Sequence, residues 1–208
     1  IRQVATRMGY TPNAAARTLK TNRSQTIGLL MCQRDENIWT HDFFSRVAAG
    51  IQEVMEGSGY DVTPINSLRL HTAGELLQYC VYRRYDGIII MSAGFRQEEM
   101  REILESKLPM ISIENTFPGR GAVLSDNMQG TGELVRLAYE KGHRKIAFIH
   151  GEDTSVTRTR LQSFRAVCSE LELSIPEAYL RPALYHDRKS AAREAKALLA
   201  LEETPTCI

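Results

Sequence analysis

The chain has 208 residues, 43% of them hydrophobic, which is enough to bury a substantial core and excludes a disordered chain. Its 26 basic and 25 acidic residues give a formal net charge of +1. No run of 18 apolar residues marks a transmembrane helix, so we predict no membrane partner.

The near-neutral total conceals an uneven distribution of charge. Residues 1–34 contain six basic residues and no Asp or Glu, which leaves 20 basic against 25 acidic residues in 35–208. A basic arm on an acidic body predicts a nucleic-acid contact confined to one end of the chain. The alternative is a solvated basic tail.

The four cysteines are widely spaced and include no C-x-x-C pair. They are Cys32, Cys80, Cys168 and Cys207. No histidine lies at metal-ligand spacing from them. We therefore predict reduced cysteines of a cytosolic protein and no metal site.

The first 20 residues predict two short helices. Ile1, Val4, Ala5 and Met8 have helical spacing, and Gly9 follows where a helix commonly ends. A second helix is expected from about Pro12 to Lys20, with the Thr11 hydroxyl as its N-cap. Helices shorter than ~12–15 residues are marginal alone in water, so this helix needs a partner.

From Thr26 onward, apolar runs alternate with helical patterns. Strands are predicted at residues 27–32, 60–65, 87–91, 109–113, 122–124, 146–149 and 179–184, with a further strand beginning at Ile208. Helices are predicted at 42–56, 73–85, 97–107, 129–140, 157–171 and 190–201, with Leu134, Leu137 and Ala138 facing inward. Repeated βαβ units build parallel sheets covered by helices on both faces, so a doubly wound α/β fold is expected.

The segment Gly9–Leu19 resembles the hinge helix of the LacI/GalR family of bacterial transcription regulators. The family pattern G-Y-x-P-N-x-x-A-R-x-L is matched by Gly9, Tyr10, Pro12, Asn13, Ala16, Arg17 and Leu19. In that family the helix orders on operator DNA, pairs with its dimer mate in the minor groove and wedges its Leu between base pairs, as apolar wedges do. The resemblance implies DNA contacts by Asn13, Ala16, Arg17, Leu19 and the adjacent Lys20. The alternative is an alanine-rich linker helix packed on its own domain.

Further motifs extend the resemblance over the whole chain. Phe43-Phe44 resembles the family's N-P-F-F, residues 85–89 its V-D-G-L-I, 125–130 its S-D-N-x-x-G, 142–149 its G-H-R-x-I-x-F-I, and 160–165 its R-L-x-G-F-R. Two departures are Ser163 in place of Gly and a longer, Trp-containing loop at 36–41.

These motifs imply a periplasmic-binding-protein-like core of two doubly wound parallel-sheet subdomains. We predict the end of a helical DNA-binding headpiece and the hinge helix at 1–24, an N-terminal subdomain at 25–142, and an incomplete C-terminal subdomain at 143–208. The helix-turn-helix would lie upstream, so the chain is expected to be a fragment.

The resemblance also implies an effector site. In open α/β sheets a ligand lies beyond the carboxyl ends of the strands. Asp126 can accept hydrogen bonds from hydroxyls and Arg160 offers a rigid fork of donors, which suits a sugar or another small polar metabolite. Phe43 and Phe44, with Trp39, are expected to stack on its apolar face. The alternatives are a helix N-cap for Asp126, a surface ion pair for Arg160, and core packing for one Phe.

No motif predicts catalysis or a cofactor. The sequence contains no G-x-G-x-x-G after a strand, no Walker motif and no G-x-S-x-G. The leading hypothesis is a cytoplasmic repressor that forms a homodimer or higher homo-oligomer, binds operator DNA and responds to a sugar-like effector in a cleft between its subdomains. A second is an exported sugar-binding protein of the same fold. A third, a sugar- or nucleotide-modifying enzyme, would need a catalytic constellation.

Overall fold

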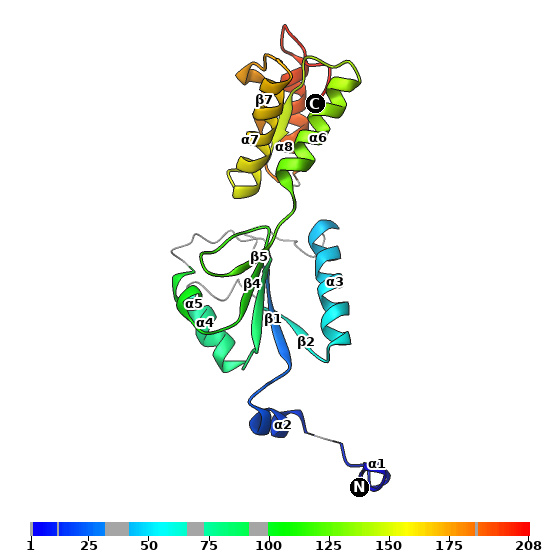
Figure 1. The fold of residues 1–208 in the computed structure, drawn as a ribbon, viewed down its shortest axis with the longest axis vertical. Coiled ribbons are helices and arrows are strands. Elements are labelled where there is room, and N and C mark those ends of the chain that lie inside the picture. Colours follow the sequence, from blue (N-terminus) through cyan, green and yellow to red (C-terminus); the bar gives the residue numbers. More distant parts are fainter. Residues whose placement is uncertain (1, 12, 32–41, 66–72, 92–99, 186) are drawn as a thin grey trace. The chain divides into compact units, whose positions relative to one another are not determined.

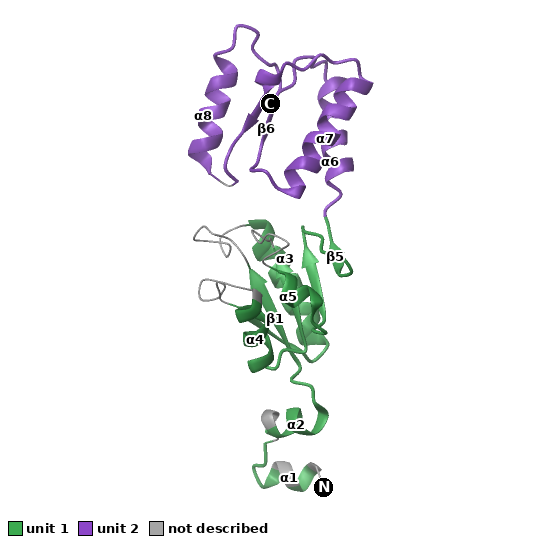
Figure 2. Ribbon diagram, turned by 90° about the vertical axis from the view of Figure 1, so that its left-hand side faces the viewer, with its two compact units in different colours: residues 1–124 green, residues 125–208 purple. Residues whose placement is uncertain are grey.

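A computed structural model describes residues 2–11, 13–31, 42–65, 73–91, 100–185 and 187–208 of the chain. The chain forms two compact units, unit 1 (residues 1–124) and unit 2 (residues 125–208), shown in Figure 2. The predicted subdomain boundary after residue 142 differs from this division, because helix α6 (Asn127–Glu140) packs along α7 (Ser155–Glu170).

Unit 1 begins with two short helices, α1 (Arg2–Arg7) and α2 (Ala14–Thr21). Gly9 follows α1 with φ of 69°, the left-handed conformation predicted for a residue after a helix end. The N-cap of α2 is Asn13 and not Thr11, because the Asn13 Oδ1 accepts the backbone N–H of Ala16 at 3.3 Å. The helix therefore begins later than the sequence pattern predicted.

The sheet of unit 1 is parallel and five-stranded, in the order β2-β1-β3-β4-β5. Its strands are β1 (Thr26–Met31), β2 (Asp61–Ile65), β3 (Gly87–Met91), β4 (Met110–Ile113) and β5 (Gly121–Val123). The helices that cover it are α3 (Asp42–Gly57), α4 (Ala73–Tyr82) and α5 (Arg101–Glu105). This arrangement confirms the doubly wound parallel sheet predicted for this part of the chain.

The core of unit 1 has two layers, one on each face of the sheet (Figure 1). Ile88 and Ile90 of β3 pack with residues of α4 and α5, among them Leu76 and Ile103. Ile89 and Met91 point to the other face, where Phe44 of α3 contributes to the second layer. Alternate residues of one strand therefore fill both layers, and this explains why its sequence is apolar throughout.

Unit 2 has a smaller parallel sheet made of β6 (Phe148–His150) and β7 (Leu180–Pro182). Ile146 and Cys207 form a further parallel bridge. A 3-10 helix, η3 (Glu177–Tyr179), precedes β7, and α8 (Arg188–Leu199) follows it. Phe148 packs against α7, while Ile149 packs with Leu198 of α8, so helices cover both faces.

The predicted inward face of α6 is wrong in part. Leu134 and Leu137 are 67% and 49% exposed, whereas Val135 is 4% exposed and Gly132 is buried. The face toward α7 is set by Gly132, since a Cβ there would lie 3.3 Å from atoms of Ser163 and Val167. Ser163 stands where the family has Gly, and its hydroxyl donates to the Met128 carbonyl at 2.5 Å. The close approach of the two helices thus fixes the phase of α6.

Three of the cysteines are free thiols, as predicted, and Cys32 lies outside the described residues. Burial raises the pKa of Cys80 and of Cys168 to about 11, so neither forms appreciable thiolate near neutral pH. None of the helices in the described ranges is long and apolar enough to cross a membrane.

Arg120 closes the end of α5. Its guanidinium donates to the carbonyl oxygens of Ile103, Leu104, Ser106 and Leu108 at 2.5–3.3 Å. The last carbonyls of a helix have no partner within the helix, so a cation that donates to several of them stabilises its end.

We expect Arg120→Ala to lower the free energy of unfolding by about 1.5–3 kcal/mol, the range for losing hydrogen bonds to a charged group. Urea denaturation followed by circular dichroism measures the loss. The control is Arg101→Ala, which truncates an exposed arginine at the start of the same helix and should change stability by under ~0.5 kcal/mol. Equal stabilities for the two variants would contradict the capping role.

Candidate functional site

A cavity of about 200 Å³ lies in unit 2, at the carboxyl ends of β6 and β7. It is lined by Phe148, Ile149, His150, Gly151, Thr157, Arg160, Ala183, Leu184, Tyr185 and Ala191. Its wall combines apolar side chains with the polar groups of His150, Thr157, Arg160 and Tyr185, in nearly equal parts. Its position agrees with the strand-end rule used to predict the effector site.

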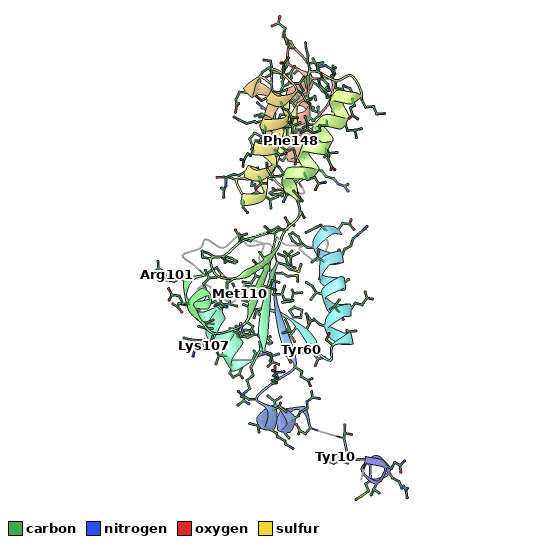
Figure 3. All side chains as sticks on the ribbon, viewed as in Figure 1. Tyr10, Tyr60, Arg101, Lys107, Met110 and Phe148 are labelled. Atoms are coloured by element: carbon green, nitrogen blue, oxygen red, sulfur yellow. The ribbon has the colours of Figure 1, made fainter. Side chains whose placement is uncertain are left out.

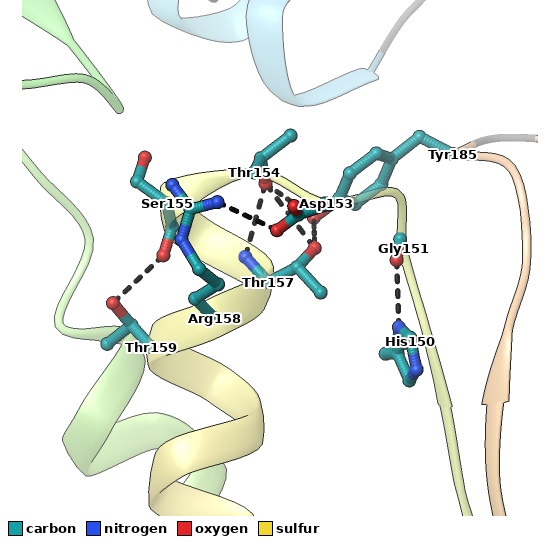
Figure 4. Close-up of polar contacts among 9 residues, drawn as sticks. All are labelled: His150, Gly151, Asp153, Thr154, Ser155, Thr157, Arg158, Thr159 and Tyr185. Carbon is teal, nitrogen blue, oxygen red and sulfur yellow. Dashed lines mark hydrogen bonds and ion pairs between the residues drawn. The ribbon is translucent and has the colours of Figure 1, made fainter.

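The first turn of α7 contributes Thr157 to the cavity lining, and Figure 4 shows the hydrogen bonds that Thr157 makes with Thr154 and Tyr185. The Thr154 hydroxyl caps the helix by accepting the backbone N–H of Thr157 at 3.2 Å. Thr157 is 3% exposed, and its own hydroxyl shares a hydrogen bond of 2.5 Å with the Tyr185 phenol. Tyr185, which follows β7, is thereby fixed against the segment that follows β6.

Gly151 allows the Tyr185 ring to lie directly on the backbone after β6. A Cβ at position 151 would approach three ring carbons to within 2.2–2.5 Å, so any larger residue would displace the ring. His150 also contributes to this region, with its Nδ1 placed 2.8 Å from the Gly151 carbonyl oxygen. Gly151 is therefore in contact with both the Tyr185 ring and the His150 imidazole.

Arg160 enters the cavity from the second turn of α7. Its side chain is half-buried, and its Nε donates to the Asn127 Oδ1 at 2.7 Å. Within the part of the chain that the structure describes, Arg160 forms no ion pair, in contrast to Arg158, which binds Asp153 at 2.7 Å. Among the described residues, Arg160 therefore forms a hydrogen bond with an amide and not the surface ion pair that was considered as its alternative role.

The other predicted effector residues have structural roles of their own. Asp126 is exposed and caps α6, its Oδ1 accepting the N–H of Gln129 at 2.9 Å. Phe43 and Phe44 begin α3 in unit 1, with ring centroids 5.1 Å apart. Phe44 belongs to the core and Phe43 is 41% exposed. Trp39 lies outside the described residues.

Sequence reasoning missed Tyr185 and His150. Both lie at the carboxyl end of a strand: His150 is the last residue of β6, and Tyr185 follows β7 by three residues. The strand before Tyr185 has only three residues and carries an Arg and a Pro, so its apolar signal was weak. The rule that ligands bind at carboxyl strand ends could have found both residues.

The residues predicted to contact DNA are all exposed on α2 or at its cap. They are Asn13, Ala16, Arg17, Leu19 and Lys20. Leu19 is 72% exposed, so it does not pack on the chain's own domain. Neither Arg17 nor Lys20 forms an ion pair with a described residue, and Figure 3 shows this part of the chain with its side chains. A large apolar side chain is thus presented to solvent between two cations.

A family model and two curated relatives that match this chain all indicate a regulator of the LacI type. Residues 24–207 match the family described as periplasmic binding proteins and sugar binding domain of the LacI family. The chain is 28% identical to catabolite control protein A of Priestia megaterium over 214 residues, covering 97% of this chain and 60% of that protein. It is 26% identical to the ribose operon repressor of Haemophilus influenzae over 215 residues, covering 100% of this chain and 62% of that protein.

A solved structure shares the fold. A complex of the transcriptional regulator CelR with cellobiose superposes with a TM-score of 0.72 at 20% identity, over 95% of this chain and 59% of that one. The chain therefore spans about 60% of the length of the curated relatives it matches.

We expect the hydrogen bond between Thr157 and Tyr185 to be worth about 1 kcal/mol to the stability of unit 2, the usual value for a partly buried pair. Thr157→Val and Tyr185→Phe each remove one hydroxyl at nearly constant shape, and the double variant completes a cycle. Urea denaturation of the four proteins should give a coupling energy of about 0.5–1 kcal/mol. Additive losses would show that the two side chains do not act as a pair.

Proposed function

The chain belongs to the LacI/GalR family of transcription regulators, and from this membership we propose that it acts in an effector-controlled repressor that binds operator DNA. The observation that carries the proposal is α2, which exposes Leu19 between the cations Arg17 and Lys20. An exported sugar-binding protein of the same fold has no use for such a helix. Its basic arm would also lack a partner.

The chemistry of α2 suits the minor groove. An apolar side chain on a short helix can enter between base pairs, and the cost of unstacking is recovered through the wider contact with bent DNA. Arg17 and Lys20 would bind the flanking phosphates, which makes the affinity salt-dependent. Because α2 has only eight residues, we propose that DNA and a dimer mate supply the packing that stabilises it.

We propose a sugar or similar small polar metabolite as the effector. Arg160 offers planar donors for hydroxyl or carboxylate oxygens, and the mixed lining of the cavity, with Phe148, Ile149 and Leu184 beside polar groups, suits a sugar ring with its hydroxyls. The CelR neighbour was solved with cellobiose, which supports this class. Asp126, Phe43 and Phe44 remain proposed contacts, from their match to the family's positions.

Control requires that the effector distinguish two states of the protein. A ligand shifts an equilibrium only by the difference in its affinity for the two states. Binding at the cavity must therefore alter how α2 is held in the dimer. Since operator DNA is the partner, we propose that the protein acts in the cytoplasm.

Leu19→Ala should weaken operator binding by about 10- to 100-fold, the equivalent of ~1.4–2.8 kcal/mol, because the wedge is removed while the cations remain. Affinity and bending are measured by electrophoretic mobility shift on a DNA site selected by the unaltered protein. The control is Leu199→Ala, which truncates a 61% exposed leucine on α8. An affinity equal to that of the control would remove Leu19 from the interface.

Arg160→Ala should abolish release of DNA by the effector and leave operator affinity unchanged, because Arg160 belongs to the cavity of unit 2 and the proposed DNA contacts belong to α2 of unit 1. A panel of mono- and disaccharides identifies the compound that releases DNA from the unaltered protein, and calorimetry gives its affinity for each variant. We expect a loss of at least about 10-fold. Arg165→Ala is the matched control, an exposed arginine of the same helix paired with Glu177. An undiminished response in Arg160→Ala would exclude that residue from the site.

A further inference from the structure

Residues Ser24 and Gln25, here called the linker, join α2 to the sheet of unit 1. Both residues are held by one carboxylate, that of Asp86, which directly precedes β3. Its Oδ1 accepts the backbone N–H and the hydroxyl of Ser24 at 2.9 and 3.1 Å. Its Oδ2 accepts the backbone N–H of Gln25 at 3.0 Å. The linker therefore has three hydrogen bonds to a single charged group.

The surrounding contacts fix the linker further. Gln25 has a φ of 55°, the left-handed region that a non-glycine residue occupies only when its surroundings hold it there. Its carbonyl oxygen accepts the N–H of Asp61 at 2.8 Å, and the Thr26 carbonyl accepts the N–H of Asp86 at 2.9 Å. The Ser24 hydroxyl also accepts the N–H of Thr26 at 3.1 Å. The turn is thus joined to Asp61, the first residue of β2, and to Asp86, the residue before β3.

Asp86 directly precedes β3, and this position connects the linker to the sheet of unit 1. The strand that follows it, β3, is buried along its whole length, from Gly87 to Met91. A carboxylate attached to such a strand moves with the sheet and not with the linker. Hydrogen bonds to a charged acceptor are also the stronger kind, because the acceptor carries a full charge. The segment that follows α2 is therefore attached to the residue next to a fully buried strand of unit 1.

We propose that Asp86 is a positioning residue that clamps the linker to the sheet and thereby sets the placement of α2 for DNA binding. This inference rests on the proposed function. It adds the residue through which the body of the protein holds its DNA-binding helix. Asp86 itself touches no DNA in this proposal.

The variant Asp86→Asn tests the clamp at constant shape. An amide replaces one accepting oxygen by an NH2 group, which would face a backbone N–H of the linker, so at least one hydrogen bond is lost. Asp61→Asn is the matched control. The Asp61 side chain is exposed and only its backbone contacts the linker, so this change removes the same charge at the same end of the sheet.

The rate of cleavage by trypsin measures the clamp without DNA. Trypsin cleaves after Lys20 and Arg23, just before the linker, and a loosened linker should be cleaved faster there. We expect cleavage there to be at least about 10-fold faster in Asp86→Asn than in Asp61→Asn, in line with the loss of a charged hydrogen bond. Operator affinity should fall by a similar factor in Asp86→Asn and not in Asp61→Asn. The melting temperature and the response to effector should be unchanged in both variants. Equal cleavage rates would overturn the clamp, and faster cleavage with equal operator affinities would overturn the positioning role.

Hydrogen exchange on the unaltered protein tests the same proposal without any variant. The amides of Ser24 and Gln25 should exchange at least 10-fold more slowly than that of Arg23, whose N–H donates to the Thr21 hydroxyl at the exposed end of α2 at 3.3 Å and to no other residue in the described ranges. Exchange of all three at one rate would show that no clamp exists, even if Asp86→Asn fails to fold. A protein that protects these amides but binds no DNA retains the clamp and refutes the proposed function, so the two failures are distinguishable.

Discussion

The burial of β3 on both faces is the constraint on which unit 1 depends. Ile88 and Ile90 need one helical layer, and Ile89 and Met91 need another. A central strand of this kind needs an apolar layer on each face of the sheet, which the helices of a parallel α/β sheet supply here. All strands then run in the same direction, so the sheet has two chemically different ends. The linker lies at the amino end, and the carboxyl end is where this class of fold binds ligands.

Unit 2 follows the same logic with fewer strands. Helices α6 and α7 approach closely because Gly132 has no side chain there. The Ser163 hydroxyl, which lies in the same contact, donates a hydrogen bond to the Met128 carbonyl. This packing places the N-terminus of α7 beside the ends of β6 and β7. One wall of the cavity is therefore supplied by α7, from which Thr157 and Arg160 both come. A departure from the family pattern at residue 163 has been accommodated without opening the interface.

The sequence predicted the elements of the fold well because buried strands and helix ends have strong local signals. Continuous apolar runs gave β1 and β3, and Gly9 gave the end of α1. The failures arose where a choice depended on tertiary contacts. Leu134 and Val135 are both apolar, and only the position of α7 decides which one is buried.

The same limit applied to the candidate sites. Asn13 and Thr11 are both good caps, and local pattern did not separate them. Arg160 was proposed from its motif and lies in the cavity lining, whereas Tyr185 follows a strand of three residues that has little signal. The Asp86 clamp was not predicted at all, since it joins residues 62 and 61 positions apart in the sequence. Contacts of that range depend on the register of the sheet, which no local pattern encodes.

The size of the clamp is appropriate for a regulatory contact. Hydrogen bonds to a charged group contribute about 1.5–3 kcal/mol, and allosteric coupling between two sites is typically ~1–3 kcal/mol, or 5- to 150-fold in affinity. A helix of eight residues is itself marginal, so its order on DNA depends on how its base is held. A change in the sheet that weakens the hold of Asp86 on the linker would therefore be sufficient to lower operator affinity by a regulatory factor. No change within α2 would be needed.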